Sequence, residues 1–390
     1  MTETAPMLEP PKAAPRTAHI KYLDGLRGCS ALYVVLFHLY GNNPVPSAHR
    51  WIRVVTGWTH WGEYAVDVFI VLSGYSLMLP IARSDANRLR GGFAGYIKRR
   101  AWRILPPYYA ALIIGLALCF VVPAERLALH PGALSLGSVL SHLLLVHNIK
   151  APWARSIDPP MWSVATEWQI YFLFPSLLLP AWRRFGNAAV IILGFSIGML
   201  PIFLSRGRWF WWASPWFLGL FCLGMVGAVQ AHPGPARTRK SMSRRSSAGW
   251  LTACFFGLLC FVSVYLPADV KRYPYLMDSL VGAVTVLFLA YCAQQDKARI
   301  SNGGTAMALR ILESRTAVWL GMVSYSLYLV HAIVMIYLCD PVSSFVAAAI
   351  PGEPPLAFVA QAAFNLFSVL VISYVFYLFF EKPFVAIRAS

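Results

Sequence analysis

Long apolar stretches, separated by short polar or basic segments, run through most of the chain. An apolar run of roughly 18–20 residues is long enough to cross a bilayer as a single helix. The pattern therefore predicts an all-α, polytopic helical membrane protein with about ten transmembrane helices. The spans are expected at residues 24–41, 63–81, 104–123, 161–181, 187–205, 209–230, 248–267, 277–293, 317–337 and 355–380.

A shorter apolar stretch, "LGSVLSHLLLVHNI" at 136–149, contains two histidines. A helix needs roughly 20 residues to span the bilayer, so this stretch is short for that purpose. We expect it to form a re-entrant or interfacial segment instead.

The distribution of basic residues bears on this arrangement. If the N-terminus is cytoplasmic and ten spans alternate, 24 of the 33 Lys and Arg residues fall inside and 9 fall outside. Membrane proteins carry such an excess in their cytoplasmic loops. The bias predicts a multi-pass protein of the inner or plasma membrane with both termini in the cytoplasm. A full span at 136–149 would place the later basic loops outside.

The amino-acid composition also indicates a membrane protein. The chain is 58% hydrophobic and 13% charged, whereas soluble domains are about 45–50% apolar and about 25% charged. The net charge of +17 lies beside apolar segments, so we expect no nucleic-acid partner. The seven cysteines form no Cys-x-x-Cys motif, and neither a disulfide framework nor a bound metal is expected.

The domain organisation is expected to be simple. Residues 1–20 are rich in Pro, Ala and Thr without a contiguous apolar core, which predicts a disordered cytoplasmic tail. Residues 21–385 should form a single membrane domain, with no appended soluble domain and no internal repeat.

The first apolar stretch, "YLDGLRGCSALYVVLFHLY" at 22–40, keeps Arg27 and His38 within a helix that is otherwise suited to lipid. Eleven residues make about three helical turns, so the two side chains share a face and lie roughly 16 Å apart along the axis. Histidine accepts and returns protons near neutral pH. His38 is therefore our candidate general base, and Arg27 a candidate binding residue at the cytoplasmic end.

A second polar face lies in "PMWSVATEWQIYFLFP", where Ser163, Glu167 and Tyr171 recur every four residues. A carboxylate inside the membrane must be paired, protonated or exposed to a wet cavity. Glu167 is our second catalytic candidate, as a partner that orients His38, and Ser163 is a binding candidate. A structural hydrogen bond to another helix is the alternative for Glu167.

Two further stretches carry polar side chains at membrane depth. In "VSYSLYLVHAIV", Ser324, Tyr328 and His331 recur at helical spacing, and in "VDVFIVLSGYS" the polar positions are Asp67 and Ser73. All five are binding candidates, because ionisable and polar groups are costly in lipid. Structural roles are the alternative, and for Ser73 with its neighbour Gly74 we favour packing, since a Ser-Gly pair allows close helix approach.

A basic cluster, "YIKRRAWRILPPYY", precedes the third span. Arg100 and Arg103 are three residues apart and could together hold a phosphate in forked contacts. Basic residues at this place can also serve topology alone.

Six stretches, in this order, resemble the acyltransferase-3 family of integral membrane O-acyltransferases over about residues 22–383. They are "YLDGLRG…LFH", "VDVFIVLSGY", "KRRAWRILPPYY", "MWSVATEWQIYFLFP", "SYSLYLVH" and "FEKPF". The family's Arg-x10-His pattern falls on Arg27 and His38, and its Arg-x-x-Arg pattern on Arg100 and Arg103. Its usual Phe-Phe-x-x-Ser-Gly is matched in part by "VFIVLSG" at 68–74, which keeps one of the two aromatic residues.

The resemblance implies transfer of an acyl group, expected to be acetyl, from cytoplasmic acyl-CoA to a carbohydrate hydroxyl, with no bound cofactor. Surface or exported polysaccharide is the expected acceptor, and a macrolide-type metabolite is the alternative. Ser163, Ser324, Tyr328 and His331 could position groups or stabilise an oxyanion, and a covalent acyl-enzyme remains open. A proton-coupled transporter is the rival class, since buried His and Glu also form proton relays.

Overall fold

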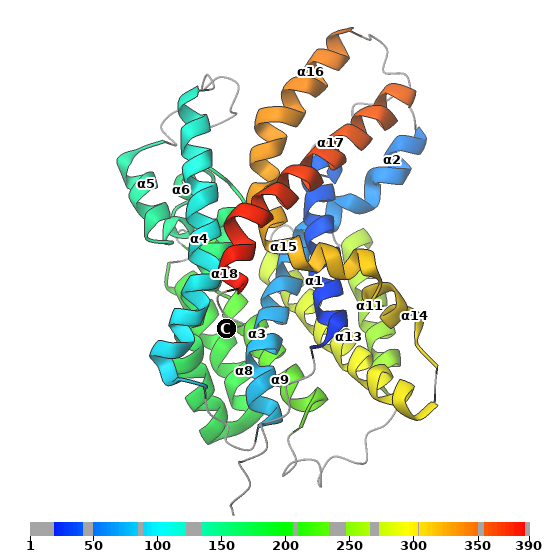
Figure 1. The fold of residues 1–390 in the computed structure, drawn as a ribbon. Helices are drawn as coiled ribbons and strands as arrows, with labels where there is room; N and C mark the ends of the chain where they lie inside the picture. Colours follow the sequence, from blue (N-terminus) through cyan, green and yellow to red (C-terminus); the bar gives the residue numbers. More distant parts are fainter. Residues whose placement is uncertain are drawn as a thin grey trace, which may run out of the picture.

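The computed structural model describes residues 19–41, 50–84, 89–121, 134–205, 210–233, 247–265, 273–302, 304–349 and 355–386, and within them all regular secondary structure is helical (Figure 1). Most of the tail expected at residues 1–20 lies outside the described residues. The helices are α1 (Lys21–Leu36), η1 (Phe37–Gly41), α2 (Arg50–Thr56), η2 (Gly57–Tyr64), α3 (Ala65–Arg83), α4 (Gly92–Val121), α5 (Leu136–Leu143), η4 (His147–Ile149), α6 (Ala151–Ala154), α7 (Met161–Leu173), η5 (Phe174–Leu178), α8 (Leu179–Leu204), η6 (Trp211–Ala213), α9 (Phe217–Ala231), α11 (Ser247–Tyr265), α13 (Pro274–Asn302), α14 (Met307–Leu312), α15 (Arg315–Val334), η7 (Met335–Cys339), α16 (Asp340–Ala349), α17 (Pro355–Phe376), η8 (Tyr377–Glu381) and α18 (Lys382–Ala386).

Seven helical stretches within the described residues are long and apolar enough to cross a membrane. The longest, at 161–204, holds 44 residues, about twice the length that one crossing requires. Gly186 interrupts it with φ 83° and ψ −167°, so two helices meet there. The sequence predicted a boundary between spans near this glycine. The total of about ten spans stays a prediction.

The expected first span is less apolar than the others because it contains Asp24, Arg27 and His38. It forms α1 and then continues as the π-helical turn η1, which contains His38. Turns of this kind are rare and often accompany functional sites. The predicted first span therefore exists as a continuous helix over 21–41, although it is not among the seven strongly apolar stretches.

The polar helix α1 lies inside the molecule because glycines let it approach α15 closely. A Cβ atom at Gly25 would overlap the carbonyl group of Leu312, and one at Gly28 would overlap α15 near Ala317. On the other side, a Cβ atom at Gly321 of α15 would overlap the backbone of Asp24. Small residues at crossings bring helix backbones together in membranes. The crossing fixes α1 against the helix that carries Tyr328 and His331.

A second close crossing joins α3 to α9. A Cβ atom at Gly74 would overlap the carbonyl group of Phe221, and one at Gly224 would overlap that of Val71. The packing role expected for the Ser-Gly pair in α3 is thus confirmed for Gly74. Ser73, its neighbour, is turned toward α7, as described below.

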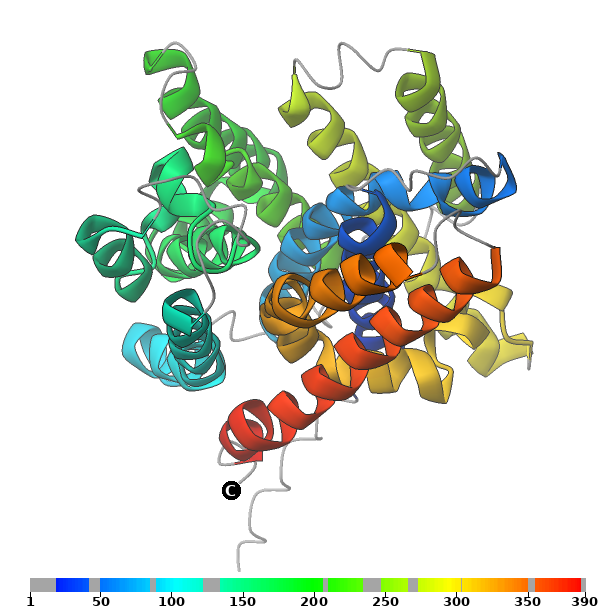
Figure 2. The same ribbon diagram turned by 90° about the horizontal axis from the view of Figure 1, so that it is seen from above.

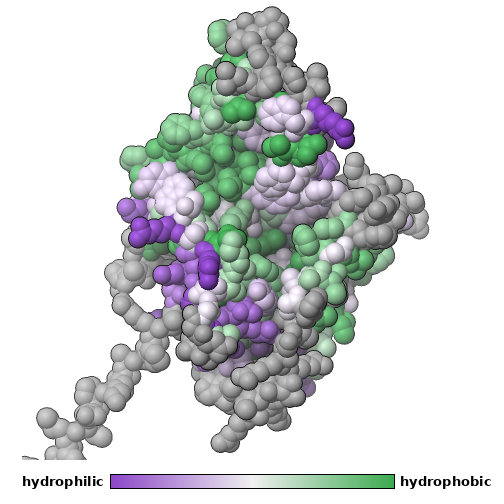
Figure 3. Space-filling model, turned by 90° about the vertical axis from the view of Figure 1, so that its right-hand side faces the viewer, coloured by the Kyte–Doolittle hydropathy of each residue, from purple (hydrophilic) through white to green (hydrophobic). Residues whose placement is uncertain are grey.

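The view in Figure 2 separates the helices into two groups. Helices α4 to α8, drawn cyan to green, lie on one side, and the blue, yellow, orange and red helices lie on the other. Side chains of α7 bond to both α3 and α15 across the junction. Outer helices expose large apolar side chains, such as Ile192 at 65% and Phe367 at 66%. Apolar residues also cover much of the face in Figure 3, and hydrophilic residues gather mostly in its lower half. Lipid would cover these apolar surfaces.

The stretch at 136–149 does not form a long helix. It contains the eight-residue α5 and the three-residue η4, and eight residues extend only about 12 Å. The prediction that this stretch is not a full span agrees with these lengths. Its entry into the membrane remains a prediction.

Candidate active site

His38 and His331 lie side by side at the end of α1 and in α15. Their ring centroids are 4.9 Å apart with an interplanar angle of 60°. His331 is completely buried, whereas His38 is half-buried. Two imidazolium ions at this distance would repel each other, so the pair is suited to holding one proton at a time.

Hydrogen bonds to backbone carbonyls determine which ring nitrogens carry protons. Nδ1 of His38 lies 2.9 Å from the Val34 carbonyl oxygen, and Nδ1 of His331 lies 2.7 Å from that of Tyr328. A carbonyl oxygen can only accept, so Nδ1 donates in both rings, and Nε2 of each neutral ring keeps its lone pair. In His331 this Nε2 is buried and has no hydrogen-bond partner among the described residues. Both rings are thus held as bases.

Tyr328, whose ring lies next to His331, connects this pair to α7. Ser163 Oγ of α7 is 2.6 Å from the Tyr328 hydroxyl of α15, and Tyr328 also donates to the Pro160 carbonyl oxygen at 3.1 Å. The Tyr328 and His331 rings are 5.7 Å apart. The structure therefore joins four of the predicted residues, Ser163, Tyr328, His331 and His38, into one polar row.

Glu167 lies one helical turn further along α7 and belongs to a second cluster. Its Oε1 accepts hydrogen bonds from Ser73 of α3 and from the Tyr171 hydroxyl at 2.5 Å. Ser73 Oγ and the Tyr171 hydroxyl are also 2.8 Å apart. The expected partnership of Glu167 with His38 is not seen among the described contacts, where Nδ1 of His38 bonds to Val34. The interhelical hydrogen bond considered as the alternative for Glu167 is present.

Two arginines lie near this carboxylate, and a third lies near both of them. Arg27 and Arg100 lie within electrostatic range of Glu167, and Arg103 lies within range of both arginines. The Arg100 guanidinium is 5.9 Å from the centroid of the Tyr171 ring. A negative charge on Glu167 can therefore compensate part of this buried positive charge. Arg100 and Arg103, predicted from their spacing, do lie near the other site residues.

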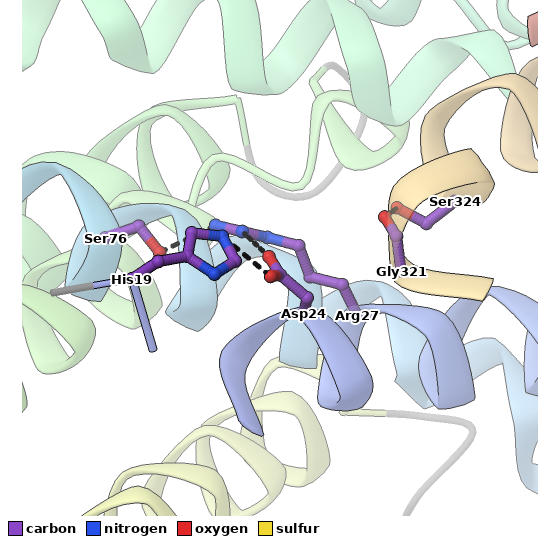
Figure 4. A network of polar contacts seen from close by, with 6 residues as sticks. All are labelled: His19, Asp24, Arg27, Ser76, Gly321 and Ser324. Atoms are coloured by element: carbon purple, nitrogen blue, oxygen red, sulfur yellow. Dashed lines mark hydrogen bonds and ion pairs between the residues drawn. The ribbon is translucent and has the colours of Figure 1, made fainter. Parts of the chain in front are cut away.

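Arg27 also borders a pocket of about 220 Å³ at the N-terminal end of α1, which is the end predicted to be cytoplasmic. Figure 4 shows its polar contacts: Nη2 of Arg27 donates to Ser76 at 2.6 Å, and Asp24 pairs with Arg27 at 3.5 Å and with His19 at 2.9 Å. Arg83 lines the same pocket. Arg27 thus lies between the pocket and the Glu167 cluster.

Two predicted binding residues have other surroundings. The Ser324 hydroxyl donates to the carbonyl oxygen of Gly321 in its own helix at 2.8 Å, as Figure 4 also shows. Buried Asp67 lies within electrostatic range of Asp278 and Glu63. Asp278 in turn accepts a hydrogen bond from Trp216 at 2.6 Å. The described contacts bring neither Ser324 nor Asp67 to the row that contains His38.

The structure adds residues that were not among the site residues predicted from the sequence. Ser76 binds Arg27, and Tyr171 binds Glu167; only Tyr171 had a signal, its four-residue spacing from Glu167. Asp158, just before α7, is 1% exposed, and neither carboxyl oxygen has a hydrogen-bond partner among the described residues. Burial raises the pKa of Asp158 well above its ordinary value.

The two histidines of the 136–149 stretch form another buried pair. The rings of His142 and His147 stack at 3.8 Å with an interplanar angle of 8°. Burial lowers the pKa of His142 to about 4, and burial together with the neighbouring His142 lowers the pKa of His147 to about 3. Both rings are therefore neutral near pH 7.

Paired histidines that keep a lone pair, inside a helical bundle with an arginine-lined pocket at one end, are suited to proton transfer in a membrane enzyme. The chain belongs to the acyltransferase-3 family, because the family's acyltransferase domain matches residues 20–378. It is therefore an acyltransferase and a multi-pass membrane protein. Within the described residues, no three His, Cys, Asp or Glu side chains are grouped to hold a metal ion.

Curated relatives share this family. YrhL of Bacillus subtilis, provisionally named a peptidoglycan O-acetyltransferase, is 28% identical over 355 residues, which cover 81% of this chain and 49% of YrhL. Peptidoglycan O-acetyltransferase OatA of Listeria monocytogenes is 22% identical, with 80% and 49% covered. This chain thus spans about half the length of these two relatives. Acyltransferase MdmB of Streptomyces mycarofaciens is 26% identical, with 83% and 81% covered. No solved structure gives a significant match.

Proposed function

We propose that the protein transfers an acetyl group from cytoplasmic acyl-CoA to a hydroxyl group of a carbohydrate, such as a surface or exported polysaccharide. The observation that carries this proposal is the His38–His331 pair, in which each Nδ1 is bonded to a carbonyl oxygen and each Nε2 keeps a lone pair. An alcohol becomes an effective nucleophile when such a base removes its proton. Two relatives named for peptidoglycan O-acetylation support a glycan acceptor.

In the proposed reaction, the residues of the polar row have different roles. His38 Nε2 takes the proton of the acceptor hydroxyl while the oxygen attacks the thioester carbonyl carbon. The Ser163 hydroxyl donates to the oxyanion that develops on the carbonyl oxygen, while the Tyr328 hydroxyl keeps its bond to the Pro160 carbonyl oxygen and holds Ser163 in place. When the carbon–sulfur bond breaks, the leaving thiolate receives the proton from the His38 imidazolium. The ester and free CoA are released, and His38 is neutral again.

Glu167 serves this reaction indirectly. Its carboxylate accepts hydrogen bonds from Ser73 and Tyr171 and lies within electrostatic range of Arg27 and Arg100. Its negative charge therefore stabilises these two arginines between the pocket and His38. Arg100 and Arg103 contribute to donor binding in this proposal. His331 keeps the His38 ring in place and limits the pair to one proton.

The experiment that tests the acceptor is mass spectrometry of envelope glycans and secreted metabolites from cells with and without the gene. Loss of an O-acetyl group from a glycan would support the proposal. Loss of the same group from a macrolide-type metabolite would support the alternative acceptor. Unchanged glycans and metabolites in a strain that expresses the protein would contradict both. Because the chain belongs to an acyltransferase family, we no longer favour the transporter interpretation.

A further inference from the structure

Asp158 carries a buried carboxyl group that makes no hydrogen bond to the described residues. It lies just before α7 and is 1% exposed, and neither of its two carboxyl oxygens has a hydrogen-bond partner among those residues. Burying a polar group without a partner costs free energy. Both oxygens can accept a hydrogen bond from a hydroxyl group. The Asp158 side chain is therefore able to bind a polar ligand without giving up an existing bond.

The backbone around Asp158 is hydrogen-bonded and closely packed, in contrast to its side chain. The Asp158 amide donates to the carbonyl oxygen of Ser156 at 2.7 Å, and the Asp158 carbonyl oxygen accepts from the Met161 amide at 3.1 Å. Ile157 has φ 65°, a left-handed conformation that β-branched residues rarely adopt. A Cβ atom at Gly115 of α4 would lie 3.1 Å from the Ile157 side chain. Packing against α4 therefore keeps Ile157 in this conformation and fixes the position of Asp158.

The Asp158 carboxyl group lies near the polar row of the candidate active site. It is within electrostatic range of the Tyr328 hydroxyl, which bonds to Ser163. Tyr108 of α4 and Tyr337 of η7 are also within electrostatic range of Asp158. Tyr337 is only half-buried. The surroundings of Asp158 thus extend from the polar row to a side chain that reaches the surface.

Along α7, Asp158 and the arginines lie on opposite sides of the polar row. Ser163 is in the first turn of α7, and Asp158 comes just before this helix. One turn beyond Ser163, Glu167 lies within electrostatic range of Arg27 and Arg100. The arginines offer positive charge to the phosphates of an acyl-CoA donor, whereas a carboxyl group offers none. Asp158 is instead suited to the other substrate, whose hydroxyl groups can donate to it.

We propose that Asp158 binds the acceptor carbohydrate by accepting a hydrogen bond from a hydroxyl group next to the one that is acylated. This inference rests on the proposed function, and it places the acceptor at the end of α7 opposite the arginines. Sugars carry hydroxyl groups on adjacent carbon atoms, so binding one of them orients its neighbour toward His38. A site that hydrogen-bonds a substrate hydroxyl also discriminates against molecules that lack it. Asp158 thus contributes to acceptor affinity and to acceptor specificity.

The test separates acceptor binding from donor binding and from stability. Acetyl transfer from acetyl-CoA to polysaccharide isolated from a strain that lacks the gene is measured with the purified full-length protein. Asp158→Leu should lower kcat/KM for this polysaccharide about 10–100-fold, since a hydrogen bond between the acceptor and a buried carboxyl group is lost. The Kd of acetyl-CoA should stay the same. The melting temperature should equal or exceed that of wild type, because a buried carboxyl group without a partner is removed.

Two further variants complete the comparison. Asp158→Asn keeps the size of the side chain and one accepting oxygen, so kcat/KM for the polysaccharide should fall less than in Asp158→Leu. The control is Thr285→Val of α13, which removes a buried hydroxyl group that donates to the Val281 carbonyl oxygen at 2.8 Å. This control should change neither kcat/KM for the polysaccharide nor the Kd of acetyl-CoA.

Several results would overturn the assignment. One is a folded Asp158→Leu protein whose kcat/KM for the polysaccharide equals that of wild type. Another is an equal loss of acetyl-CoA affinity, because Asp158 would then support the whole site rather than the acceptor. A melting temperature well below that of wild type would assign the carboxyl group to the fold instead. Wild-type protein that transfers no acetyl group to the polysaccharide would refute the proposed glycan acceptor itself, and this inference with it.

Discussion

Hydrogen bonds at single residues set the chemistry of the candidate site. His38 and His331 each donate from Nδ1 to a carbonyl oxygen of their own helix, which leaves Nε2 as the basic atom. Glu167 accepts hydrogen bonds from Ser73 and Tyr171 instead. In the proposed reaction, His38 and Glu167 therefore have different roles.

Glu167→Gln separates charge from hydrogen bonding. The amide oxygen can still accept from Ser73 and Tyr171, but the negative charge in range of Arg27 and Arg100 is lost. We expect kcat/KM for acyl-CoA to fall about tenfold or more, because a buried charge without its partner is costly. Tyr171→Phe keeps the charge and should have a smaller effect. Steady-state kinetics that show wild-type values for Glu167→Gln would contradict this role.

Sequence reasoning located several site residues but not all of their partners. The eleven-residue spacing placed Arg27 and His38 on one helix, and four-residue spacing placed Glu167 with Tyr171. Contacts between distant segments have no such local signal. The His38–His331 contact depends on the α1–α15 crossing, and the Glu167–Ser73 bond depends on the approach of α7 to α3.

At the scale of elements, the glycine crossing of α1 and α15 positions both histidines. Gly321→Ala adds a Cβ atom that would overlap the backbone of Asp24. Backbone atoms cannot move aside as a flexible side chain can, so we expect a loss of about 1–3 kcal/mol in stability. Thermal unfolding in detergent measures this change. Gly257→Ala of α11 is the control, since nothing lies within 4 Å of its added Cβ atom, and equal melting temperatures would contradict the prediction.

The element between α4 and α7 should respond to acid through His142 and His147. Their folded pKa values, about 4 and about 3, lie below the ordinary value for histidine. Between about pH 6.5 and 4 the unfolded chain binds protons that the folded protein does not. Stability should therefore fall on acidification through this window, by up to about 1.4 kcal/mol per pH unit for each histidine.

Thermal unfolding at a series of pH values tests this dependence. His142→Gln with His147→Gln should flatten the slope between pH 6.5 and 4, whatever its effect on stability at pH 7. Leu144→Gln, at an exposed position between the two histidines, removes no titratable group, so this control should keep the wild-type slope. A double variant with the same slope as wild type would refute the contribution of this pair.

Sequence patterns predicted helices better than their boundaries. Apolar runs gave the long helices, and the break at Gly186 lies where two predicted spans meet. The π-helical turns were not foreseen, because apolar periodicity does not distinguish them from α-helix. One of them contains His38 and changes the direction of its side chain relative to an ideal α-helix.

For the whole molecule, the charge distribution predicts the orientation in the membrane. Reporter fusions at Ser243 and Ala308 should report the cytoplasm, and a fusion at Pro351 should report the outside, since basic loops remain inside. An outside signal at Ser243 would overturn the ten-span arrangement. The same experiment fixes which side the Arg27 pocket faces.

The molecule as a whole connects that pocket with the histidine pair through Arg27 and the helix α1. The most direct test of this account is the acyl transfer rate of His38→Ala, measured on purified protein whose acyl-CoA affinity and melting temperature are determined in parallel. The account predicts a loss of about 10²–10⁴-fold in rate, with donor affinity retained. A folded His38→Ala protein that turns over at nearly the wild-type rate would contradict the assignment of His38 as the base.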